Sequence, residues 1–184
     1  MSVDSNPPAS IPDDALRATS PAPAATAAGR SLAVLRVLLG AVFTWAFLDK
    51  ALGLGFATPA DAAWVRGGSP TSGFLASREG TFGAVFRGMA GQAWVDWLFM
   101  AGMLLVGVAL LLGIALRLAA IGATCLMGTL WLASLPLENN PVVDEHVICA
   151  AAAWVLALAG AGRTFGAADR VAGLVGPRAA RWLG

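Results

Sequence analysis

The stretch that decides the fold is "WLFMAGMLLVGVALLLGIALRLAAIGATCLMGTLWLASL", residues Trp97–Leu135. It is almost wholly apolar, and Arg117 is its only charged residue. As a single helix it would be about 58 Å long, nearly twice the roughly 30 Å hydrocarbon core of a bilayer. We therefore predict a helical hairpin that turns near Gly113–Leu118, with membrane spans at about 95–115 and 118–136.

Two further apolar runs flank this hairpin. The first, "SLAVLRVLLGAVFTWAFLDKALGLGF", covers Ser31–Phe56, and the last covers about 142–162. Each is long enough for a bilayer crossing, which needs roughly 20 helical residues. The expected fold is an all-α integral membrane protein, a four-transmembrane-helix bundle over 31–163 with an extended outer loop, 57–94, between its first two helices.

The composition favours the same class of protein. Of the 184 residues, 58% are hydrophobic and 12% are charged, whereas soluble domains carry about 25% charged residues. The net charge of +1 and the scattered arginines argue against nucleic-acid binding. The chain has seven tryptophans, and tryptophan is enriched at membrane interfaces. The lipid bilayer is therefore the first predicted partner.

The distribution of Lys and Arg predicts the orientation, because cytoplasmic ends carry an excess of positive charge. Arg17, Arg30, Arg36, Arg117, Arg163, Arg170, Arg178 and Arg181 fall on the side of both termini, and Lys50, Arg66, Arg78 and Arg87 fall on the other. We expect a multi-pass membrane protein with cytoplasmic termini. Residues 1–30 are rich in Pro, Ala and Ser, and we predict that they form a disordered cytoplasmic tail. Residues 164–184 are predicted to form a tail that lies at the cytoplasmic membrane interface.

The outer loop contains helix signals of its own. Thr58 is a candidate N-cap, followed by Pro59 and Asp61 at positions that favour a helix start. Four apolar residues then recur at helical spacing: Phe82, Val85, Phe86 and Met89. This pattern predicts either a helix that lies on the membrane surface and covers the outer end of the bundle, or an ordinary ordered loop.

Small residues predict how the last span packs, because they let membrane helices approach closely. Its small-residue face consists of Ala150, Ala153, Ala157 and Ala161. His146 falls on that face one turn earlier, so we expect it to point into the bundle. Arg36, in the first span, is expected to extend to phosphate groups at the cytoplasmic surface.

The polar residues of the spans gather at the predicted outer end. They are Trp45, Asp49, Lys50, Asp96, Trp131, Asn140, Asp144, Glu145 and His146. Ionisable groups in a membrane are costly and often functional, so they predict one polar pocket roofed by the outer loop. Simpler explanations remain open: tryptophans anchor helix ends, carboxylates complement helix dipoles, and the end of the first span faces water.

The sequence does not predict a metal or nucleotide cofactor. Asp144, Glu145 and His146 would lie about 100° apart on a helix, which argues against their converging on one metal. A single histidine cannot ligate a haem on both sides, and no phosphate-binding glycine loop is present. Cys125 and Cys149 are expected to be small apolar fillers, with a redox role as the alternative.

Three short motifs together resemble the DoxX family of four-helix membrane proteins. They are "N-P-x-x-D-x-H" at Asn140, Pro141, Asp144 and His146, "D-K" at Asp49 and Lys50, and "G-x-x-x-R-x-A-A" at Gly113, Arg117, Ala119 and Ala120. The resemblance covers about 31–169. It is strongest to DoxD-like members, identified as large subunits of thiosulfate:quinone oxidoreductase.

The resemblance implies a quinone-linked membrane subunit that works with other protein subunits of a redox complex and uses menaquinone or ubiquinone as substrate. The expected catalytic residues are His146, Asp144 and Asp49, and the expected quinone-binding residues are Lys50, Trp45, Trp131 and Asn140. The alternative is a non-catalytic anchor or assembly subunit, so the sequence leaves open whether the chain is an enzyme. A transporter is less favoured, because no span is broken by Pro or paired Gly.

Overall fold

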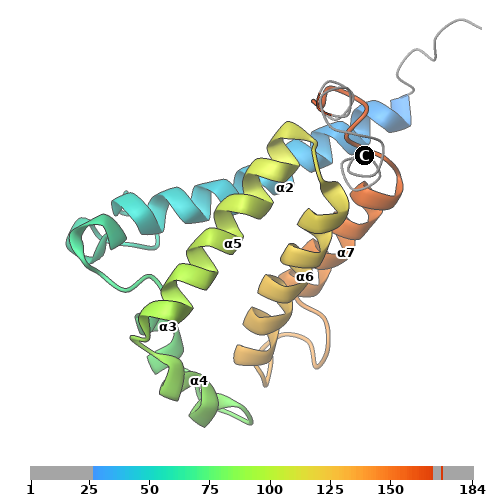
Figure 1. Cartoon of the computed structure of the whole chain (residues 1–184). Helices are drawn as coiled ribbons and strands as arrows, with labels where there is room; N and C mark the ends of the chain where they lie inside the picture. Colours follow the sequence, from blue (N-terminus) through green and yellow to red (C-terminus); the bar gives the residue numbers. More distant parts are fainter. Residues whose placement is uncertain (1–26, 168–170, 172–184) are drawn as a thin grey trace, which may run out of the picture.

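The computed structural model describes residues 27–167 and 171, which form helices and no strand (Figure 1). The elements are α2 (Ala27–Leu52), η1 (Ala60–Ala62), η2 (Trp64–Arg66), α3 (Ser72–Ala76), α4 (Gly83–Met89), α5 (Ala93–Leu112), α6 (Leu116–Ala133) and α7 (Glu145–Leu158), where η marks a 3-10 turn. Three helices, α2, α5 and α6, are long and apolar enough to cross a membrane. The fold is thus compatible with the predicted helical membrane protein.

The predicted hairpin is present between α5 and α6. Gly113 follows α5 with a φ of 69°, and its N–H donates to the Leu110 carbonyl at 3.2 Å. This left-handed C-cap suits glycine, which has no Cβ to clash. Ala115, with a φ of 50°, completes the turn before α6 begins. The hairpin prediction is therefore confirmed.

The last predicted span, 142–162, is only partly helical. α7 has 14 residues and a length of about 21 Å, which is shorter than the hydrocarbon core of about 30 Å. It ends before a turn at Gly160, where φ is 63°. A fourth crossing would therefore need the residues that flank α7 as well as the helix itself.

The long helices pack as two pairs, α2 with α5 and α6 with α7, and contacts between α5 and α6 join the pairs (Figure 1). Small residues allow the close approach. A Cβ at Gly40 of α2 would lie 2.9 Å from the Leu111 nitrogen of α5. On α7, Ala153 and Ala157 are buried, and Ala161 is buried just beyond it. The prediction that this alanine face packs inside is confirmed for these three residues.

Arg36 does not extend to the surface, so the expectation that it reaches lipid phosphates is wrong. Its side chain is 0% exposed. Nη1 donates to the carbonyls of Leu110 and Leu111 at 2.6 and 3.0 Å, and Nη2 donates to those of Thr164 and Phe165 at 3.4 and 3.1 Å. The guanidinium therefore joins α2 to the end of α5 and to the chain after α7. It satisfies carbonyls that a helix end leaves without partners.

The 53–92 segment between α2 and α5 is ordered by short elements. The predicted Thr58 cap is wrong, because η1 is a 3-10 turn without a side-chain cap. The second signal does form a helix, α4, and Phe86 is buried with Leu75, Val95 and Ala133. Val85 remains exposed, so the apolar face is divided. Since Ala133 belongs to α6, the segment packs over that end of the bundle.

The predicted tails fall largely outside the described residues. Residues 1–26 lie beyond them, and 27–30 belong to α2 instead of a disordered tail. The interfacial segment that ends in "RAARWLG" is likewise outside the described part. The predicted cytoplasmic orientation of the termini stays a prediction.

Candidate functional site

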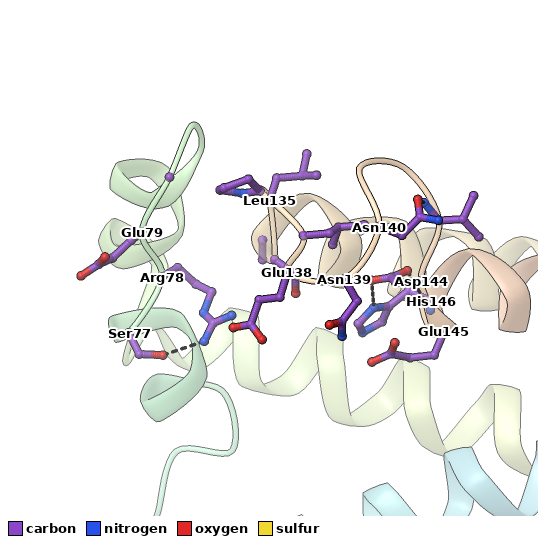
Figure 2. A pocket seen from close by; sticks show the side chains of 16 residues that line it. Ser77, Arg78, Glu79, Leu135, Glu138, Asn139, Asn140, Asp144, Glu145 and His146 are labelled. Carbon is purple, nitrogen blue, oxygen red and sulfur yellow. Dashed lines mark hydrogen bonds and ion pairs between the residues drawn. The ribbon is translucent and has the colours of Figure 1, made fainter.

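A polar cavity of about 680 Å³ lies between the α3–α4 connection and the α6–α7 loop (Figure 2). Its volume falls in the range of small-molecule sites, about 300–1,000 Å³. It is lined by Ser77, Arg78, Glu79, Gly80, Ala133, Ser134, Leu135, Pro136, Leu137, Glu138, Asn139, Asn140, Val143, Asp144, Glu145 and His146. The cavity thus contains Asn140, Asp144 and His146 from the predicted site, together with several charged residues that sequence reasoning did not single out.

The α6–α7 loop owes its shape to hydrogen bonds from its own side chains. The Asn140 Oδ1 accepts the N–H groups of Val142 and Val143, each at 2.9 Å. Trp131, on the last turns of α6, donates its Nε1–H to the Val142 carbonyl at 2.9 Å. Trp131 does not line the cavity. Both residues therefore order the wall that leads into α7.

Asp144 is the N-cap of α7. Its backbone is extended, with φ −134° and ψ −171°, and its Oδ1 accepts the N–H groups of His146 at 3.0 Å and Val147 at 3.3 Å. These are two of the donors that a helix start leaves unpaired. The other oxygen, Oδ2, lies 2.8 Å from the His146 Nδ1. One carboxylate thus starts the helix and also holds the histidine ring.

Opposing effects act on the pKa of Asp144. Burial raises the pKa. The hydrogen bonds from the His146 side chain and from the backbone N–H groups of Val147 and His146, together with the charge of protonated His146, lower the pKa by more than burial raises it. The net result is a pKa below the ordinary aspartate value. Asp144 is therefore a carboxylate at neutral pH, ready to accept the Nδ1–H of His146.

The His146 side chain is 17% exposed and that of Asp144 is 14% exposed. With Nδ1 turned toward Asp144, the Nε2 of His146 is left for another partner. Figure 2 shows the ring beside Asn139, on the cavity wall that α7 forms. His146 is therefore mostly buried and lines a cavity at the start of α7; the expectation that it points into the bundle stays a prediction.

The prediction that Asp144, Glu145 and His146 cannot converge on one metal is wrong. One ligand atom from each lies within 4.8 Å of the other two. The helical spacing of about 100° does not apply to Asp144, because the N-cap has an extended backbone and lies outside the helix. The geometry of the three side chains therefore does not exclude a metal ion.

The remaining predicted site residues lie elsewhere, at the end of α2. Asp49 is 2% exposed, and its two oxygens accept the N–H groups of Phe56 at 3.2 Å and Ala57 at 3.0 Å. Trp45 packs edge-on against Phe56, with ring centroids 5.1 Å apart, and Lys50 is half-buried nearby in the sequence. Figure 1 shows this end of α2 well apart from the α6–α7 loop. The predicted residues therefore form two groups instead of one pocket.

Asp96, at the start of α5, fastens the 53–92 segment. Its Oδ1 accepts the hydroxyl groups of Ser69 and Thr71 at 3.0 and 2.6 Å and the N–H of Thr71 at 3.1 Å. Trp64 and Trp97 add an edge-to-face pair with centroids 4.6 Å apart. Asp96 therefore positions the segment that carries one wall of the cavity.

In the part of the chain that the structure describes, the fold is all-helical, three helices are long and apolar enough to span a membrane, and a charged cavity lies where α6 ends and α7 begins. No protein family, curated protein or solved structure matches the chain. The resemblance to DoxX proteins accordingly stays a prediction.

Proposed function

We propose that the chain is a membrane subunit of a quinone-linked oxidoreductase and that a quinone head group binds in the cavity beside His146. The observation that carries the proposal is the 2.8 Å contact between His146 Nδ1 and Asp144 Oδ2 in a cavity next to apolar helices. A histidine held at Nδ1 by a carboxylate presents Nε2 as a proton acceptor when the ring is neutral and as a hydrogen-bond and proton donor when the ring is protonated. The apolar surface of the helices suits the long tail of a quinone.

The proposal includes a fourth membrane crossing by α7. The helix itself is too short, so the chain after it, through 162, would complete the apolar length, and Asp144 would lie at the membrane surface. Both termini would then lie on one side, the cytoplasmic side of a bacterial inner membrane by the distribution of arginines. The cavity would face the outer leaflet.

In the proposed reaction, reduction of a quinone to a quinol takes up two electrons and two protons, one on each carbonyl oxygen. The electrons come from a partner subunit. The step requires the imidazolium form of His146, in which both ring nitrogens carry a proton. Its Nε2–H donates to one carbonyl and transfers its proton as the oxygen becomes a hydroxyl, which leaves a neutral ring whose Nδ1–H still bonds to Asp144. Asp144 stabilises the ring in this orientation, and Glu145, which lines the same cavity, supplies the replacement proton from solvent.

We assign Asp49 a different part from Asp144. Both of its oxygens accept backbone N–H groups, which favours a role in holding the chain after α2 over one in proton transfer. Trp131 and Asn140 would shape the loop that borders the quinone. Trp45 and Lys50, at the end of α2, would bind lipid or a partner subunit instead of the head group.

The test is retention of quinone by the purified chain. We expect wild-type protein extracted from membranes to carry quinone, and His146→Ala and Asp144→Asn to lose most of it. Asp61→Asn, which changes an exposed carboxylate of η1, is the matched control and should retain it. Equal quinone content in all four proteins would remove the cavity from quinone binding.

A second function, as an anchor or assembly subunit, is favoured by the surface of the 53–92 segment. Phe56, Val65 and Val85 are each more than half exposed on it, while Asp49 and Asp96 hold it in a fixed shape. Such a platform suits a protein partner. Co-purification with a stoichiometric partner and without quinone would favour this function over the first.

A further inference from the structure

The wall of the cavity opposite His146 carries one cationic side chain, Arg78, which follows α3. Figure 2 shows Arg78 and Glu138 projecting into the same space, with His146 on the other side. Among the described residues, the only ion pair is the one between His146 and Asp144. The Arg78 charge therefore faces the cavity without a carboxylate within ion-pair distance.

The guanidinium of Arg78 is held in place on its rear side. Nε donates to the Phe74 carbonyl at 3.0 Å, Nη2 donates to the Ser77 hydroxyl at 3.0 Å, and the charged carbon lies 4.2 Å from the centroid of the Phe74 ring. Arginine has five N–H donors, and these bonds use two. The two N–H groups on Nη1 and the second N–H on Nη2 remain available to a ligand. Because the guanidinium is already held in place, Arg78 loses little conformational entropy when a ligand binds.

The position of this wall is fixed against the α6–α7 loop. Gly80 has a φ of 80°, and its Cα lies close to the Leu135 carbonyl and the Pro136 ring. A Cβ at this position would clash with both. Arg87, on α4, donates from Nη1 to the Arg78 carbonyl. The backbone of Arg78 is thus tied to α4 and, through Gly80, to the loop that leads to His146.

The geometry points to Arg78 as a second donor for the quinone head group, bonding the carbonyl that His146 does not reach. This inference rests on the proposed function and names the ligand class that the cavity selects: a ring with oxygen acceptors on two opposite sides. The guanidinium also stabilises negative charge on the distal oxygen as electrons arrive, because a fixed cation favours the charged form. Arg78 keeps its protons throughout, so the second proton comes from solvent in the cavity.

The experiment compares two probes of similar size, 1,4-naphthoquinone, with two opposite carbonyls, and 1-tetralone, with one. Dissociation constants are measured on the purified full-length chain in detergent. We expect Arg78→Gln to weaken the binding of 1,4-naphthoquinone about tenfold, which corresponds to the lower end of the free-energy range for a hydrogen bond to a charged group. The dissociation constant of 1-tetralone should change less than about twofold, because its one carbonyl accepts its hydrogen bond from His146 and makes none with Arg78.

The controls separate binding from folding. Arg66→Gln removes an exposed guanidinium from η2 in the same segment and should change neither constant. Arg78→Lys should recover part of the 1,4-naphthoquinone affinity. If Arg78→Gln does not fold, the comparison of the two probes on the wild-type chain tests the assignment. We expect the wild-type chain to bind 1,4-naphthoquinone about tenfold tighter than 1-tetralone. Equal affinities for the two probes would overturn the assignment.

The remaining outcomes distinguish this inference from the proposed function. If Arg78→Gln leaves both probes unchanged while His146→Ala weakens 1,4-naphthoquinone, the site binds quinone and Arg78 is not a donor. If Arg78→Gln weakens both probes equally, its role is structural and the inference is overturned. If the wild-type chain binds neither probe, the proposed function and the inference fail together.

Discussion

Replacing Arg36 with methionine should destabilise the protein, although hydropathy alone would rate the change as favourable for a membrane helix. The guanidinium donates to four backbone carbonyls. Of these, the Leu110 carbonyl also accepts the Gly113 N–H at 3.2 Å. The substitution therefore removes the side-chain donor from the carbonyls of Leu111, Thr164 and Phe165 without a replacement.

The cost of leaving a fully buried acceptor unpaired is about 1–3 kcal/mol. These three hydrogen bonds are only partly buried, and Phe165 is exposed, so we take the lower value, about 3 kcal/mol in all. Removing a buried charge offsets part of this loss, because its desolvation is costly. We therefore expect a net loss of about 2 kcal/mol for Arg36→Met. Arg36→Lys should recover only a fraction, since an ammonium group lacks the planar fork that reaches carbonyls on two segments.

The assay is thermal unfolding of the purified chain in detergent, where a loss of this size lowers Tm by about 6 °C for a chain of this length. Arg117→Met is the matched control, because Arg117 lies at the neighbouring helix start and is exposed. It should shift Tm by no more than about 2 °C. Equal melting temperatures for Arg36→Met and Arg117→Met would refute the assignment of Arg36 as the joint between α2, α5 and the chain after α7.

Four further predictions concern the turns and the cavity. Gly113→Ala should cost about 2 kcal/mol or more in unfolding free energy, since alanine at φ 69° is strained and its Cβ would meet the Arg36 guanidinium. Asp144→Ala should cost about 1 kcal/mol through the lost N-cap, measured by denaturant unfolding. Because the pKa of Asp144 is lowered in the folded state, its stabilising effect is present at neutral pH and lost as pH falls through that lowered pKa; Asp144→Asn should flatten the acid side of the stability profile. Trp131→Phe, which removes the donor to Val142, should cost about 1 kcal/mol and increase hydrogen exchange at 137–143.

The elements that the sequence predicted best are those set by local patterns. The hairpin turn required only the length of the apolar run and a glycine at its middle, and Gly113 lies where that argument put it. The buried alanine face of α7 follows from residue size at four-residue spacing. Both depend on neighbours within one helix or one turn, so a single sequence is sufficient to find them.

The misplaced residues are those whose partners are distant along the chain or irregular in backbone. The sequence places Arg36 at the surface, because its acceptors at Thr164 and Phe165 lie far away along the chain. Helical angles do not predict the approach of Asp144 to His146, because Asp144 is an N-cap with an extended backbone. Arg78 carried no local signal, since only the packing of Gly80 against the α6–α7 loop brings it to the cavity.

The division of the predicted pocket has one physical cause. Where a helix leaves the bundle, the loops that follow present backbone N–H groups that need acceptors, and the few carboxylates at that end are the strongest acceptors available. Asp49 bonds two such groups after α2, and Asp96 bonds the chain before α3. Asp144 also caps a helix, but it keeps one oxygen for His146. A polar cluster predicted from composition therefore separates into carboxylates that hold loops and one that orients a side chain, and only the second kind is available to act on a ligand.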